Sequence, residues 1–138
     1  MSPEQLLGEL EGERQVVVGD LEAGIGTVLR LQPGMADAVV VVAQPTAKSI
    51  DIAARATRIA ATREVAVLVV ANRVRDDDDL SLIRETLGGH EIFVVPDDPA
   101  ILRADQEGLA PMDADGDAPG VAAIGALADR LAGSGAPA

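Results

Sequence analysis

Short apolar segments alternate with longer amphipathic segments along most of the chain. The short segments are rich in valine, run for five to seven residues and carry few polar side chains. Such runs are typical of strands that are buried in a parallel sheet. The predicted strands are 15–20, 38–43, 65–71 and 91–95.

Between and after these strands, apolar residues recur every three or four positions, which is the period of an amphipathic helix. In the clearest case, the helix over 46–63, the predicted buried face consists of Ile52, Ala56, Ile59 and Ala60. Near the N-terminus, Ser2 and Gln5 fit a capping box, with Pro3 at the first helical position. The other predicted helices are 3–10, 80–87, 98–108 and 121–131.

This alternation predicts an α/β fold with a mostly parallel sheet of about four strands and helices on both faces, a Rossmann-like three-layer arrangement. Residues 1–132 are expected to form one domain, with 111–119 as a polar linker inside it and 133–138 as a flexible tail. The strand 38–43 is almost pure valine, so we expect it to be buried on both faces.

Composition limits the kind of core and the kind of metal site. Apolar residues make up 48% of the 138 residues, but aromatic residues only 1%, with Phe93 alone. The core is therefore expected to consist of valine, isoleucine, leucine and alanine. Cysteine is absent and His90 is the only histidine, so no metal site is predicted. His90 itself lies between glycines and a strand and is expected to be a loop residue.

The formal net charge of −12 argues against two classes of partner. Negative charge repels nucleic-acid phosphates and anionic lipid, so neither nucleic acid nor a membrane surface is an expected partner. No apolar run approaches the roughly 20 residues that cross a bilayer. The N-terminal residues lack the basic and apolar regions of a signal peptide, so the expected location is the cytoplasm.

The strand 15–20 ends in a carboxylate, Asp20, and Gly24 follows four residues later. A carboxylate at a strand end can hold a magnesium-bound water, and a glycine amide can approach a phosphate because no Cβ blocks it. An aspartate at a strand end is common in other proteins too, so this pair alone proves little. The sequence has no Gly-x-x-x-x-Gly-Lys-Ser/Thr loop that would hold the phosphates.

Two further segments resemble phosphate-binding loops only in part. Gly24-x-Gly26 follows a strand, but Leu29 replaces the third glycine of a dinucleotide fingerprint. Lys48-Ser49 also follows a strand, but glycines are missing before it and Pro45 removes an amide donor. Lys48 is therefore expected to be solvated in the first turn of a helix. The alternative, that it reaches a phosphate held by a partner, stays open.

The run from Asp76 to Asp79 has two interpretations. As a calcium loop it lacks the alternate spacing and the central glycine. As the start of a helix it is favourable, since each well-placed carboxylate near a helix N-terminus stabilises it by about 0.3–1 kcal/mol. We therefore expect helix capping.

The order of these features resembles the MinD/ParA-type ATPases, and most closely the CooC-like branch that matures nickel carbon monoxide dehydrogenase. The match covers about residues 14–132, without the phosphate loop. Each motif is weak by itself, and the series is more specific. The matching motifs are Asp20-Leu21-Glu22-Ala23-Gly24-Ile25, Gln44-Pro45, Lys48-Ser49, Asn72-Arg73-Val74, Val95-Pro96-Asp97-Asp98 and Ala104-Asp105-Gln106-Glu107-Gly108.

The resemblance implies ATP and magnesium as ligands and a role for each matching residue. Asp20 would position a magnesium-bound water, and Gly24 would sense the γ-phosphate. Asn72 would contact the adenine edge, and the loop from Pro96 to Asp98 would flank the base. Without the resemblance, no cofactor follows from the residues.

The chain also departs from this family's pattern. The phosphate loop with its lysine and the cysteine pair of the nickel branch are both missing. In the family, the phosphate-loop strand lies between the strands that correspond to 15–20 and 38–43. Unpaired buried backbone groups cost about 1–3 kcal/mol each. Here the strands 15–20 and 38–43 therefore either pair directly with each other or pair with a strand inserted between them from another chain. Alternatively, the helix 3–10 covers the unpaired edge of one of them.

Three hypotheses about function follow. The favoured one is a non-catalytic relative of these ATPases, a binding, regulatory or accessory subunit that docks on an ATPase or a metalloenzyme. The alternative is a partner-dependent half of a split ATPase, whose phosphate loop comes from another chain. An unrelated enzyme that uses Asp20 and Glu22 is disfavoured, because no nucleophile–base pair accompanies them. We expect a homodimer or a complex, and no significant ATPase activity from the chain alone.

Overall fold

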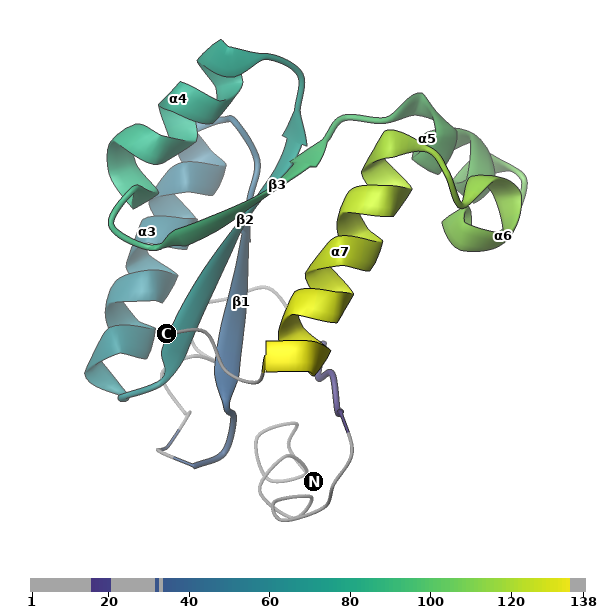
Figure 1. The fold of residues 1–138 in the computed structure, drawn as a ribbon. Helices are drawn as coiled ribbons and strands as arrows, with labels where there is room; N and C mark the ends of the chain where they lie inside the picture. Colours follow the sequence, from purple (N-terminus) through teal and green to yellow (C-terminus); the bar gives the residue numbers. More distant parts are fainter. Residues whose placement is uncertain (1–15, 21–31, 33, 135–138) are drawn as a thin grey trace.

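The computed structural model describes residues 16–20, 32 and 34–134, which form an α/β domain with a three-stranded sheet (Figure 1). The strands are β1 (Ala38–Ala43), β2 (Ala66–Val74) and β3 (Glu91–Pro96). The helices are α3 (Ala47–Thr62), α4 (Asp77–Leu87), α5 (Pro99–Gln106), α6 (Pro111–Asp115) and α7 (Pro119–Ser134).

All three strands are parallel, in the order β1-β2-β3, as the alternation of strands and helices predicted. The sheet has one strand fewer than expected, because residues 16–20 form no regular structure. Val16 is 70% and Val18 is 85% exposed. An apolar segment becomes a strand only where a neighbour completes its hydrogen bonds. Residues 16–20 have no such neighbour among the described residues.

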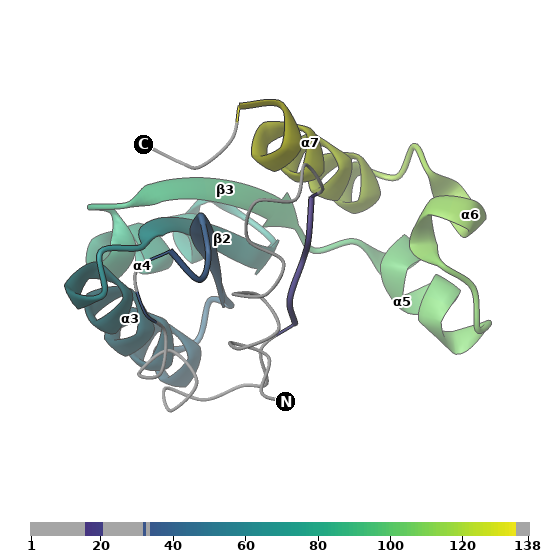
Figure 2. The same ribbon diagram turned by 90° about the horizontal axis from the view of Figure 1, so that it is seen from below.

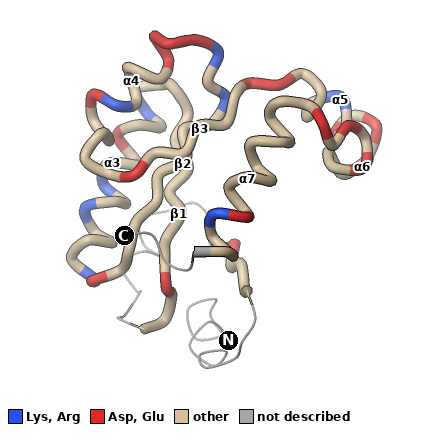
Figure 3. Tube along the Cα trace, in the orientation of Figure 1, with Lys and Arg blue, Asp and Glu red and all other residues tan. Residues whose placement is uncertain are grey.

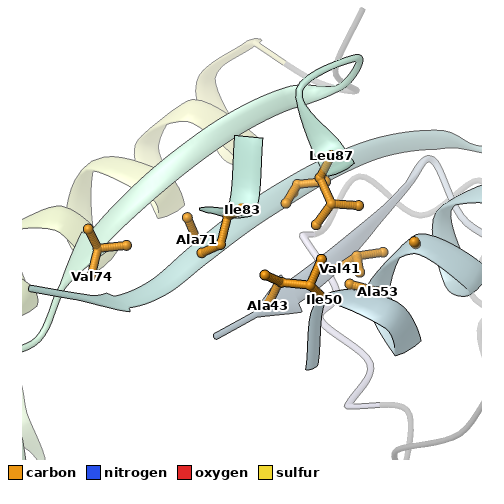
Figure 4. Close-up of a cluster of buried hydrophobic side chains, with 10 residues drawn as sticks. Val41, Ala43, Ile50, Ala53, Ala71, Val74, Ile83 and Leu87 are labelled. Carbon is orange, nitrogen blue, oxygen red and sulfur yellow. The ribbon is translucent and has the colours of Figure 1, made fainter. Parts of the chain in front are cut away.

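Helices cover both faces of the sheet, as predicted. Helices α3 and α4 lie on one face and α7 lies on the other, against β3 (Figures 1 and 2). Side chains alternate between the faces of a strand, so every second strand residue points toward α3 and α4. Figure 4 shows the resulting cluster of small aliphatic side chains. Its buried members are Val41, Ala43, Ile50, Ala53, Ala54, Val69, Ala71, Val74, Ile83 and Leu87.

The opposite face is covered unevenly. In the central strand β2, Leu68 and Val70 are buried on this face. In β1, Val40 is 36% and Val42 is 56% exposed. The prediction that this strand is buried on both faces was therefore wrong. Its sequence is as apolar as that of β2, but β1 lies at the edge of the sheet.

Helix α3 forms where the pattern predicted it, but its buried face is rotated. Ile52 is exposed, whereas Thr57 is buried. The buried set is Ile50, Ala53, Ala54, Thr57 and Ala60. A threonine is tolerated in this core because its Oγ1 donates a hydrogen bond to the Ala54 carbonyl at 2.9 Å.

The C-terminal part is more helical than the sequence suggested. The predicted linker 111–119 contains α6, and α7 begins at Pro119 and includes the first two residues of the predicted tail. Both helices begin at a proline, whose fixed φ favours the first helical position. The predicted helix 3–10 and residues 135–138 lie outside the described residues. Among the described residues, no helix combines the length and the apolar character that crossing a membrane requires.

Candidate functional site

The carboxyl ends of the three parallel strands meet at one edge of the sheet, where open α/β sheets bind their ligands (Figure 1). Three loops leave this edge: Gln44–Thr46 after β1, the end of β2 at Asn72–Val74, and Asp97–Asp98 after β3. The fold therefore brings Asn72, Pro96 and Asp98 to the same edge, as the sequence analysis expected for a base-binding site.

The loop after β1 uses its own polar groups internally. The Thr46 Oγ1 accepts a hydrogen bond from the Ser49 amide at 3.2 Å and caps α3. The Ser49 Oγ accepts one from the Gln44 amide at 2.9 Å. The backbone amides of Gln44 and Ser49 thus already donate hydrogen bonds within the loop and cannot also donate to a phosphate. Lys48 is exposed in the first turn of α3, as predicted.

The end of β2 is irregular at the residue that follows Asn72. The pairing with β3 is interrupted between Asn72 and Val74, and Arg73 has a φ of 60°. A positive φ is costly for a residue with a side chain. The Asn72 side chain is half-buried, and its carboxamide makes no hydrogen bond to any described residue.

Two contacts fix this irregular segment to the loop after β3. The Asp97 amide donates to the Val74 carbonyl at 2.9 Å. The Arg73 Nε donates to the Asp97 Oδ1 at 3.3 Å, and both side chains are exposed to solvent. An exposed ion pair stabilises a fold only slightly, so the backbone hydrogen bond from Asp97 to Val74 is the more effective link between the two segments.

The next turn begins α4 and uses the run of aspartates as caps. The Asp76 Oδ1 accepts a hydrogen bond from the Asp79 amide at 2.9 Å, which confirms the predicted capping. Asp79 turns back and binds the Arg75 guanidinium through both oxygens, at 2.9 and 3.1 Å. Hydrogen bonds from the Arg75 side chain and amide hold the pKa of Asp79 below its ordinary value.

Asp98 joins the end of β3 to two helices. Its Oδ1 accepts a hydrogen bond from the Ala100 amide at 2.9 Å and caps α5. Its Oδ2 accepts one from the Gly120 amide at 2.8 Å, in the first turn of α7. The Gly120 amide, followed by the Ala100 amide, lowers the pKa of Asp98. Both carboxylate oxygens therefore serve the fold.

The lowered pKa of Asp98 predicts a loss of stability in acid. The folded-state pKa lies below the unfolded-state value of about 3.9, so the stabilisation is present above that value. It is lost as the pH falls through the folded-state pKa. The Asp98→Asn variant should be less stable at pH 7, and its urea midpoint should fall less between pH 6 and pH 3 than that of the wild type.

Asp105→Asn is the matched control for this titration, since Asp105 is an exposed aspartate on α5. Its urea midpoint should follow the wild-type curve at every pH. Identical pH dependence of the wild type and Asp98→Asn would contradict a stabilising role of the ionised Asp98 carboxylate.

The structure does not bring all the predicted site residues together. Asp20 is exposed in the irregular segment 16–20, which is not a strand, and Gly24 lies outside the described residues. Within 16–20, 32 and 34–134, no three acidic or histidine side chains form a group that could hold a metal ion.

The sequence analysis placed Asp97 only in the loop that would flank the base and assigned no role to Arg73 or Gly120, yet these three residues link the loops at this edge. Arg73 and Asp97 are 24 residues apart, and only the register between β2 and β3 identifies them as partners. Asp98 and Gly120 are 22 residues apart, and their contact depends on where α7 begins. The edge thus presents the half-buried carboxamide of Asn72, next to two segments that contact each other, the end of β2 and the loop after β3. Such an arrangement suits the binding of a planar polar group. No protein-family model matches the chain, and no curated protein matches it significantly.

Proposed function

We propose that this chain is a non-catalytic relative of the MinD/ParA-type ATPases that serves as a binding or regulatory subunit and recognises the base of an adenine nucleotide. The observation that carries the proposal is the Asn72 side chain, which is half-buried at the carboxyl edge of the parallel sheet and whose carboxamide makes no hydrogen bond to a described residue. The Pro96 ring lies on the neighbouring strand and is half-buried. A link to metalloenzyme maturation is supported by the resemblance to the nickel branch alone.

Binding without hydrolysis is favoured by the chemistry of the residues present. Phosphoryl transfer depends on charge neutralisation at the transferred group. The only lysine of the sequence, Lys48, is exposed, and the amides of Gln44 and Ser49 are already bonded. The described residues do not assemble the magnesium end of an ATPase site, because Asp20 lies in an irregular segment. The proposal therefore concerns the base end only.

Recognition of the base predicts that AMP and ATP bind with similar affinity, and that magnesium changes neither. Asn72→Ala should weaken both by about tenfold or more, the loss expected for a polar contact to the base. Native mass spectrometry and isothermal titration calorimetry with each nucleotide would measure this. Gln106→Ala is the control, since it removes a similar amide from the exposed end of α5 and should leave binding unchanged.

Three results would contradict the proposal. The first is the absence of nucleotide binding by the wild type. The second is binding that Asn72→Ala leaves intact. The third is ATP hydrolysis by the isolated chain that Asp20→Ala abolishes, because it would mean that the chain is an enzyme in its own right.

One observation favours the alternative of a split ATPase. The outer edge of β1 pairs with no strand among the described residues, so another protein could add its phosphate-loop strand there. In that case ATP hydrolysis would appear only when the second protein is present. If a second copy of this chain pairs with the outer edge of β1, that edge cannot also take the phosphate-loop strand of another protein.

A further inference from the structure

The outer edge of β1 has no partner strand among the described residues. Within this part of the chain, β1 pairs only with β2, through six consecutive residues in regular register. No described strand therefore takes up the backbone amides and carbonyls on its other side. Val40 and Val42 are exposed on the face that α3 does not cover. Long apolar edges of this kind pair with other chains unless the protein blocks them.

None of the usual blocking devices occurs in β1. Its sequence, Ala-Val-Val-Val-Val-Ala, has no charge, no proline and no glycine. The register irregularity of the sheet lies between β2 and β3, on the side away from this edge. Figure 3 shows acidic residues at many places, among them α4, α5, α6 and the lower end of β1, while the strand itself carries none. In a chain with a net charge of −12, this neutral edge is a place where two copies can approach.

We propose that a second copy of this chain pairs with β1 in the antiparallel direction, so that the two sheets join into one of six strands. A two-fold axis perpendicular to the sheet sets residues of the same face opposite each other. With Val41 opposite the second copy's Val41, Val40 lies opposite the second copy's Val42. Val40 and Val42 of one copy then contact Val42 and Val40 of the other, so each exposed valine has an apolar neighbour.

Charges at the ends of β1 fit the antiparallel direction. Asp37 immediately precedes the strand, and Lys48 is the first basic residue after it. Neither makes a salt bridge with another described residue. Antiparallel pairing brings Asp37 of each copy to the same end as the other copy's Lys48. Parallel pairing would instead set like charges side by side.

The antiparallel pair also closes on itself. Each copy uses the same edge, so the contact ends with two chains, whereas a head-to-tail contact would continue into a fibre. Helices α3 and α4 of both copies lie on one face of the joined sheet. The contact is one strand wide, which is less than the roughly 800 Å² per partner of a standard interface, so we expect a dissociation constant in the micromolar range.

Sedimentation velocity between about 1 and 500 μM tests this pairing, since that range brackets a micromolar dissociation constant. The wild type should pass from monomer to dimer, without larger species. Val42→Lys should weaken the dimer by about tenfold or more, because it places a charge in the apolar contact. Leu102→Lys makes the same change of charge at an exposed site on α5 and should leave the dimer unchanged.

A charge exchange tests the direction of pairing. Asp37→Lys and Lys48→Asp should each weaken the dimer, because each creates two repulsive contacts across the axis. The double variant should restore it, which a merely local effect of either substitution would not do. All these positions are exposed, so the fold should persist, and circular dichroism would check it.

A wild type that remains monomeric up to 500 μM would overturn the inference. So would a dimer that Val42→Lys leaves intact, because the contact would then lie elsewhere, and a double variant that fails to recover. The inference does not depend on nucleotide binding. A wild type that dimerises but binds no nucleotide would contradict the proposed function alone, and a wild type that binds nucleotide but stays monomeric would contradict the pairing alone.

Discussion

Replacement of Ile83 by alanine should lower the free energy of unfolding by about 2–5 kcal/mol, the largest effect that we expect of a single side chain. Ile83 lies on α4, is fully buried and packs between the sheet and α3 (Figure 4). The loss combines the transfer energy of the deleted methylene and methyl groups with the cost of the cavity that they leave.

The composition of the core makes this loss serious. The core has few large side chains, and the largest fully buried ones are Leu68, Ile83 and Leu87. A domain of this size is stable by only about 5–15 kcal/mol. Alanine and valine fill most of the remaining positions, and their short side chains cannot extend into a cavity.

Leu82→Ala is the matched control, since Leu82 adjoins Ile83 on α4 but is 44% exposed. It should cost less than about 1 kcal/mol, because little buried surface is lost. Urea denaturation followed by circular dichroism would measure both variants. Equal losses would mean that α4 does not pack on the sheet through the face that contains Ile83.

The part of the fold that could be predicted from the sequence is the part with a strong local pattern. Strands β1, β2 and β3 are apolar runs bounded by turns, and each formed within a few residues of its predicted limits. Helix α4 also forms where the pattern predicted a helix, and it buries Ile83 and Leu87. In these segments, the local period and the tertiary contacts favour the same structure.

The errors occur where neighbours decide the outcome. Residues 16–18 are three valines, as apolar as β1, yet they form no strand, and no strand of the described part of the chain pairs with them. Val42 is exposed for a related reason, since β1 is an edge strand. The phase of α3 was wrong because alanine and threonine fit closely against the sheet, a preference that average hydrophobicity does not express.

The resemblance named Asn72, Pro96 and Asp98 as candidate site residues, and the sequence did not predict the contacts that connect them. The three residues lie at the same edge because the strands that carry or precede them are parallel. The contact of Arg73 with Asp97 did not follow, since it depends on the register between β2 and β3. Nor did the second bond of Asp98, which depends on where α7 begins.

Gly120→Ala should destabilise the protein by about 1–3 kcal/mol, the usual cost of forcing an extra group into a packed site. Gly120 is buried in the first turn of α7, and its amide donates to Asp98 at 2.8 Å. A Cβ at this position would lie 2.8 Å from the Asp98 Cβ and 3.0 Å from the Ile101 Cδ1. Carbon atoms do not approach so closely, so α7 would have to move away from the loop after β3.

Gly125→Ala on the same helix separates this contact from the general effect of alanine. A Cβ at Gly125 would meet nothing within 4 Å, so only helix propensity changes. That change should stabilise the protein by about 0.5–1 kcal/mol, because glycine loses more conformational entropy than alanine in a helix. The two substitutions should therefore shift the urea midpoint in opposite directions. Stabilisation by both would show that Asp98 does not hold α7 at Gly120, and that β3 and α7 are joined through other residues.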